Sequence, residues 1–99
     1  TRATPEAYAA VHAEVPDAEY HEVARAITRR RDVPAGRGTI AVLSAGTSDL
    51  PVAEEAAVTA EVMGNDVARV YDIGVAGLHR LLSERARLEA ARVLVVVAG

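Results

Sequence analysis

The stretch AVLSAGTSDLPVAEEA, residues 41–56, decides the fold, because it runs from a short apolar segment through a small polar loop into a segment rich in Ala and Glu. The continuous apolar run 39–44 is typical of a strand that is covered on both faces. The segment 51–64 predicts a helix that Gly64 closes at its C-terminal side. A buried strand that leads directly into a helix predicts the first half of a βαβ unit.

The same alternation continues to residue 99. VARVYDI (67–73) predicts a second strand, residues 78–91 a second helix, and RVLVVVAG (92–99) a third and most apolar strand. This order predicts the βαβαβ portion of an open parallel sheet with right-handed crossovers. Because no helix follows the last strand to cover it, we expect the chain to be a fragment or to associate with a partner.

The residues before the sheet are expected to form a small N-terminal segment. Thr4 and Pro5 predict the start of a helix that Pro16 ends. Residues 17–30 are ambiguous, since the spacing of their apolar residues favours a helix, although YHEVARAIT (20–28) also alternates like a hairpin strand.

The charged and Pro/Gly-rich segment RRRDVPAGRG (29–38) predicts a linker. The expected organisation is therefore an N-terminal segment and linker in residues 1–37, followed by an α/β domain in residues 38–99. The run Arg29–Arg31 is interpreted as part of a solvated linker rather than as a nucleic-acid patch.

Composition excludes several function classes. The 99 residues carry a net charge of −3, which argues against nucleic acid as the main partner. The sequence contains no cysteine, so it has no disulfide, thiolate metal site or thiol nucleophile. No apolar run reaches the ~18 to 20 residues of a membrane span, and no signal peptide opens the sequence. We expect a soluble, cytoplasmic protein with no membrane partner.

The loop after the first predicted strand is the first candidate for a binding site, because ligands of open α/β sheets bind at the carboxyl ends of the strands. Gly46 would let a ligand approach the backbone, and Thr47 and Ser48 offer hydroxyls and N–H groups that can hold a phosphate at a helix start. The alternative is plain helix capping by Ser48 or Asp49. Asp49 would repel a phosphate unless its carboxylate turned toward sugar hydroxyls.

The loop after the second predicted strand places Asp72 beside Gly74 and Gly77. An acid there can bind a ribose or a magnesium ion or transfer a proton, and the alternative is a turn residue that bonds its own backbone. His79 is interpreted as a half-buried surface residue. No metal site is predicted, since His12 and His21 have no partner at metal-ligand spacing.

A serine hydrolase is a further alternative. GTSDL (46–50) nearly matches the G-x-S-x-G nucleophile elbow, and Ser48, Asp72 and His79 follow one another in the hydrolase order. Leu50 stands where the elbow requires glycine, and the acid and the base are too close in sequence. This alternative is therefore disfavoured.

Three stretches, SAGTSDLPVAEEAAVTAEVMG (44–64), VYDIGVAGLHRLL (70–82) and ARVLVVVAG (91–99), closely resemble the carboxylase of nickel-pincer nucleotide cofactor biosynthesis. The catalytic domain of that family is similar to aminoimidazole ribonucleotide carboxylases and mutases. The resemblance implies a three-layer α/β/α, flavodoxin-like fold in residues 38–99, which would be the N-terminal part of the domain. It also implies a homo-octamer in the complete protein.

The resemblance implies a reaction as well. The family carboxylates the pyridinium ring of nicotinic acid adenine dinucleotide with CO2 or bicarbonate and cleaves the phosphoanhydride to leave AMP. On this basis the N–H groups of residues 47–49 would hold the phosphate, Ser48 and Asp49 the ribose, and the Gly74–Gly77 loop would lie close to the ligand. Asp72 would handle magnesium or a proton.

Two loops separate this family from its purine relatives. The relatives carry G-S-x-S-D where this chain has AGTSD (45–49), so Gly46 replaces the first Ser while Ser48 and Asp49 stay. They also carry S-A-H-R-T-P where this chain has YDIGVAG (71–77). The second difference favours the nickel-pincer branch, with the purine enzyme and a non-catalytic nucleotide-binding or oligomerisation module as alternatives. The family's nucleophilic cysteine is not among these residues, so we expect the chain to be inactive alone.

Overall fold

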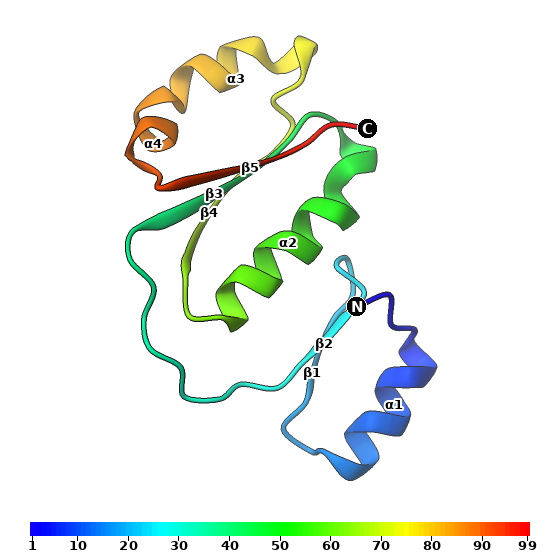
Figure 1. The fold of residues 1–99 in the computed structure, drawn as a ribbon. Coiled ribbons are helices and arrows are strands. Elements are labelled where there is room, and N and C mark those ends of the chain that lie inside the picture. The colour runs from blue at the N-terminus through cyan, green and yellow to red at the C-terminus, as the bar shows by residue number, and fades with distance from the viewer.

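The computed structural model describes residues 1–99, apart from the side chain of Ala76. The elements, in chain order, are α1 (Pro5–Glu14), β1 (Glu19–His21), β2 (Ala26–Thr28), β3 (Thr39–Ser44), η1 (Thr47–Asp49), α2 (Leu50–Val62), β4 (Asp66–Val70), η2 (Val75–Gly77), α3 (Leu78–Ser83), α4 (Arg85–Ala90) and β5 (Val93–Val97). Figure 1 shows α2 on one side of the β3–β4–β5 sheet and α3 and α4 on the other. No described helix has the length and apolar character needed to cross a membrane.

The predicted α/β fold is confirmed, with a three-stranded parallel sheet in the order β4-β3-β5. The first strand of the sheet in the sequence lies at its centre, which is the order in which flavodoxin-like folds begin. β3 is apolar along its length because its alternate residues are buried on opposite faces. Ala41 and Leu43 pack with Leu88 of α4, and Val42 packs with Ala53 and Ala57 of α2.

The N-terminal helix forms as predicted, whereas the helix favoured for residues 17–30 is wrong. β1 and β2 form an antiparallel hairpin in which Tyr20 lies opposite Ile27. Arg25, with φ of 49°, lies in the left-handed region and cannot continue a helix. Long-range contacts of Tyr20 favour the hairpin, since its hydroxyl donates to the Ala3 carbonyl at 2.9 Å and its ring stacks on Tyr8.

The hairpin packs on α2 through small residues. Ala24 and Ala26 are buried against Val58, which lies on the face of α2 turned away from the sheet. The segment 29–38 contains no helix or strand, and its side chains are exposed. Its chain nevertheless contacts the end of α2, where Gly36 N–H donates to the Gly64 carbonyl at 2.8 Å.

Two predicted elements are shorter than expected. The helix predicted over 78–91 is interrupted at Glu84 and divides into α3 and α4. At this point the Arg80 carbonyl accepts both the Ser83 hydroxyl, at 2.8 Å, and the Glu84 N–H, at 3.1 Å. The strand predicted over 67–73 ends at Val70, since Asp72, with φ of 58°, departs from extended backbone.

Candidate functional site

A cleft of about 530 Å³ lies at the carboxyl edge of the sheet, between the loop after β3 and the loop after β4. Its lining residues are Ala45, Gly46, Thr47, Asp72, Gly74, Val75, Gly77, His79 and Arg80. The topology thus brings together most of the residues that the sequence marked as candidates. Ser48 and Asp49 are the exceptions: Ser48 is exposed outside this lining, and Asp49 is turned into the protein.

Asp49 organises the first loop through both carboxylate oxygens. Gly46 N–H donates to Oδ2 at 3.0 Å, and Gly99 N–H donates to Oδ1 at 3.1 Å. The side chain makes no capping hydrogen bond to α2, and only 8% of the Asp49 surface is exposed. We assign Asp49 a positioning role, in place of the ribose contact expected from the sequence.

Two backbone donors of this loop have no acceptor within the short helix that they begin. The Asp49 N–H, expected to bind phosphate, instead donates to the Gly46 carbonyl at 3.0 Å. Thr47 and Ser48 are the first two residues of η1, and the first N–H groups of a helix have no acceptor within it. Because η1 leads directly into α2, these two N–H groups lie at the electropositive start of a longer helical segment.

The loop after β4 is tied to the loop after β3 by several hydrogen bonds. Ile73 N–H donates to the Ser44 carbonyl at 3.0 Å, and Gly74 N–H donates to the Ala45 carbonyl at 2.9 Å. The buried Ser44 hydroxyl accepts from Asp72 N–H at 3.3 Å. These bonds fix Asp72 opposite Thr47, whose hydroxyl donates to Asp72 Oδ1 at 3.5 Å.

Close backbone contacts within the protein explain why both positions of the second loop, Gly74 and Gly77, require glycine. A Cβ atom at Gly74 would lie 2.7 Å from the Ala45 carbonyl oxygen, and one at Gly77 would overlap the Asp72 carbonyl oxygen. Gly46 differs, since a Cβ there would meet only Asp49 Oδ2 at 3.8 Å. The packing of the chain therefore explains Gly74 and Gly77, while the absence of a side chain at Gly46 leaves space in the cleft.

Arg80 is a cleft residue that was not predicted from the sequence, and the interpretation of His79 as half-buried is wrong, since His79 is exposed and lines the cleft. Both are exposed in the first turn of α3, and Arg80 Nη1 donates to the Tyr71 carbonyl at 3.2 Å. This bond holds the guanidinium beside the loop after β4, whereas Thr47 comes from the loop after β3. The sequence did contain a signal for these cleft residues, namely two successive basic residues at the start of a helix that follows a strand.

The residues of a hydrolase triad are not joined. Among the described residues, no hydrogen bond connects Ser48, Asp72 and His79, and Asp72 faces Thr47 instead. The loop after β3 is a 3₁₀ turn that Asp49 holds, rather than a sharp turn that exposes Ser48 to a base. The cleft therefore provides hydrogen-bond donors suited to an anion and one carboxylate, that of Asp72.

The donor set of the cleft does not fit a magnesium ion held by the protein alone. Magnesium in nucleotide sites is usually held by one or two carboxylates together with substrate phosphates and water, so a site made by the protein alone needs more ligands than one carboxylate. Asp72 is the one carboxylate in the lining, and the described residues contain no group of three or more His, Asp or Glu suited to a metal. No step below is therefore derived through magnesium.

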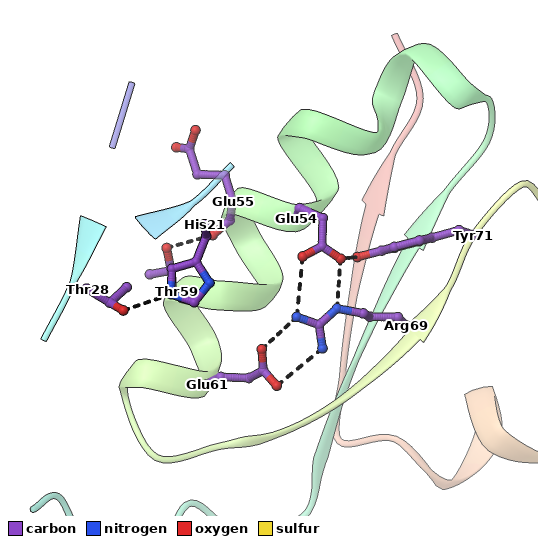
Figure 2. Close-up of polar contacts among 8 residues, drawn as sticks. All are labelled: His21, Thr28, Glu54, Glu55, Thr59, Glu61, Arg69 and Tyr71. Carbon is purple, nitrogen blue, oxygen red and sulfur yellow. Dashed lines mark hydrogen bonds and ion pairs between the residues drawn. The ribbon is translucent and has the colours of Figure 1, made fainter. Parts of the chain in front are cut away.

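A second polar cluster, between α2 and β4, was also missed by the sequence argument. Arg69 lies between Glu54, at 2.8 Å from Nε to Oε1, and Glu61, at 2.6 Å from Nη2 to Oε1 (Figure 2). The Tyr71 hydroxyl donates to Glu54 Oε1 at 2.7 Å. Burial and this hydrogen bond raise the pKa of the Tyr71 phenol.

No protein-family model matches the chain. The chain is 48% identical over 64 residues to an uncharacterized protein of Methanocaldococcus jannaschii. The aligned part covers 63% of this chain and 25% of the archaeal protein, so the chain spans about a quarter of the length of this curated relative.

Proposed function

We propose that residues 38–99 form the nucleotide-binding part of a carboxylase that acts on the pyridinium ring of nicotinic acid adenine dinucleotide. The observation that supports this proposal is the cleft at the carboxyl edge of the sheet. Thr47, with its N–H and its hydroxyl, lines the cleft together with Arg80 and Asp72. The close sequence resemblance to the nickel-pincer carboxylase family supplies the reaction.

The chain's own residues would bind and orient the nucleotide. The N–H groups of Thr47 and Ser48 and the guanidinium of Arg80 are donors suited to a phosphate. The Ser48 hydroxyl, exposed next to them, would contact the ribose. Gly46 would let the ligand approach the backbone, and the rigid loop of Gly74 and Gly77 would hold the opposite side.

Asp72 is the candidate for proton transfer. Carboxylation replaces a ring C–H bond by a C–C bond to CO2 and releases one proton, and a carboxylate beside the ligand can accept it. Water cleaves the phosphoanhydride in the second half of the reaction. The resemblance places the nucleophilic cysteine outside these residues, and it extends the proposal to a homo-octamer in which subunits complete each other's sites.

Binding tests the cleft directly. We expect nicotinic acid adenine dinucleotide to shift the amide NMR signals of Thr47, Ser48 and Arg80 in the 99-residue chain. Arg80→Gln should weaken binding about 10-fold or more, as expected for the loss of a charge-assisted bond to phosphate. Arg85→Gln, on the exposed surface of α4 and outside the cleft, is the matched control and should leave binding unchanged. Equal weakening by both variants, or shifts remote from the cleft, would remove the site.

Turnover tests the reaction. The 99-residue chain with dinucleotide and labelled bicarbonate is expected to yield no labelled product, because the nucleophile is supplied from outside it. Label in the product would show that the cysteine step is not required. Aminoimidazole ribonucleotide serves as the competing ligand, and tighter binding of it than of nicotinic acid mononucleotide would favour the purine branch.

A further inference from the structure

A second hollow, of about 370 Å³, lies between the N-terminal hairpin and the start of α2. Its lining residues are His21, Glu22, Val23, Ala24, Leu50, Glu54 and Tyr71. None of these residues lines the phosphate cleft, and the function proposed above uses none of them. The hollow is therefore a separate feature of the surface, and the hairpin builds part of it.

The hollow and the cleft draw residues from the same two chain segments at the carboxyl edge of the sheet. Tyr71, which lines the hollow, precedes Asp72, which lines the cleft, and Leu50 of the hollow lies three residues after Thr47 of the cleft. A ligand that occupied both cavities would therefore pass η1, which begins at Thr47 and ends directly before Leu50.

The walls of the hollow suit a planar apolar group. Val23 and Ala24 come from the hairpin, Leu50 comes from the first turn of α2, and the ring of Tyr71 comes from the end of β4. Tyr71 is half-buried and packs against the Val42 cluster, so its ring is held in place. Aromatic and aliphatic walls of this kind stack on flat heterocycles.

Among the polar residues of the hollow, Glu54 is the one that we expect to select for hydrogen-bond donors. Although burial raises the pKa of Glu54, hydrogen bonds from Arg69 and Tyr71 lower it, and the net shift is downward. An ionised carboxylate only accepts hydrogen bonds. Glu54 is also held by two partners before any ligand arrives, with the Arg69 Nη2 bond to Oε2 long at 3.4 Å (Figure 2).

We propose that this hollow binds an amino-bearing nucleobase, with the ring against Val23, Leu50 and Tyr71 and the exocyclic amine donating to Glu54. The link to the cleft rests on the proposed function: the base would be the adenine of the dinucleotide whose phosphate lies beside Thr47. The hairpin then acts as one wall of the substrate site. A purine that lacks the amine, and has no N–H in its place, loses this hydrogen bond and binds more weakly.

Adenosine and purine riboside are the probes, since only adenosine carries the amine and neither carries a phosphate. In the 99-residue chain, adenosine should shift the NMR signals of Val23, Ala24, Leu50 and Tyr71, and purine riboside should bind at least ~10-fold more weakly. Equal affinity for the two nucleosides would overturn the role of Glu54. Absence of shifts in the hollow at saturating adenosine would overturn the site.

Two variants and a control sharpen the test. Val23 is 53% exposed, so Val23→Asp should leave the fold intact while it weakens adenosine binding about 10-fold. Val11→Asp, at a 37% exposed position on α1, is the matched control and should bind adenosine normally. Glu54→Gln should abolish the preference for adenosine over purine riboside. Unchanged adenosine binding in Val23→Asp would contradict the proposal.

The outcome separates this inference from the proposed function. If inorganic phosphate and the dinucleotide bind at Thr47 and Arg80 while adenosine leaves the hollow unchanged, the inference fails and the proposed function stands. If adenosine binds in the hollow while Arg80→Gln leaves dinucleotide binding unchanged, the inference stands and the phosphate site fails.

Discussion

Asp49 and Gly99 are 50 positions apart in the sequence, yet Gly99 N–H donates to Asp49 Oδ1 at 3.1 Å. The second oxygen of the same carboxylate accepts from Gly46 N–H, so one side chain joins the loop after β3 to the residues after β5. The loop after β4 is joined to the β3 end through Ser44 and Ala45. The floor of the cleft is thus fixed before any ligand binds, as preorganised binding requires.

Removal of the Asp49 carboxylate should destabilise the protein. Asp49→Ala leaves two N–H groups without their acceptor in a site that is 8% exposed, and the expected loss is about 1–3 kcal/mol in the free energy of unfolding. Urea denaturation followed by circular dichroism measures this loss. Asp66→Ala, at the exposed start of β4, is the control and should change stability by less than about 0.5 kcal/mol. Similar losses in the two variants would contradict the positioning role.

The two loops should respond differently to an added methyl group. Gly74→Ala places Cβ 2.7 Å from the Ala45 carbonyl oxygen, which cannot retreat easily because it accepts the Gly74 N–H. We expect a loss of about 1–3 kcal/mol in the free energy of unfolding. Gly46→Ala, with extended backbone and no close neighbour, should stay within about 0.5 kcal/mol and weaken nucleotide binding instead. Denaturation and NMR titration of both variants check this contrast, which a stable Gly74→Ala protein would refute.

Asp72 adopts a backbone conformation that most residues avoid, with φ of 58°. Left-handed backbone costs roughly 1–2 kcal/mol for ordinary residues, least for Gly, Asn and Asp. The free energy of unfolding of Asp72→Gly should therefore lie within about 1 kcal/mol of that of the unchanged protein. Asp72→Val, which introduces a β-branched residue, should lower the free energy of unfolding by about 1–2 kcal/mol more. Thermal or urea unfolding of the pair measures the difference. Equal stabilities would mean that the loop relaxes in the variants.

The elements that could be predicted from the sequence are those encoded by local pattern. β3 is a short apolar run, α2 has a helix-ending glycine after it, and the carboxyl-edge rule then places Thr47 and Asp72 at one cleft. The hairpin was harder to predict from the sequence, because three-residue strands carry little periodicity and their stability depends on distant contacts such as that of Tyr20 with Ala3.

The errors at the candidate site have the same origin. Asp49 has the composition of a helix cap, and its inward direction depends on Gly99, which no local pattern connects to it. Arg80 enters the cleft because α3 starts immediately after η2, a boundary that the sequence indicates only to within a few residues. No sequence pattern marks Glu54 and Arg69, because the packing of α2 on β4 is what brings them together.

The Glu54–Arg69 pair should make stability depend on pH. The pKa of Glu54 in the folded protein lies below its ordinary value of 4.5, because the hydrogen bonds from Arg69 and Tyr71 outweigh the effect of burial. A group whose pKa falls on folding stabilises the protein above its unfolded pKa, and that contribution is lost as pH falls through the folded pKa. Stability should therefore decrease from about pH 5 downward.

Glu54→Gln removes this contribution and should flatten part of the acid-side decrease. The remainder belongs to other carboxylates, among them Asp17, whose pKa is lowered by its hydrogen bond with Arg29. Urea unfolding at several values between about pH 7 and pH 3 gives the curves, with Glu14→Gln on the exposed end of α1 as the control. Parallel curves for Glu54→Gln and the unchanged protein would show that the ion pair in Figure 2 does not persist in solution.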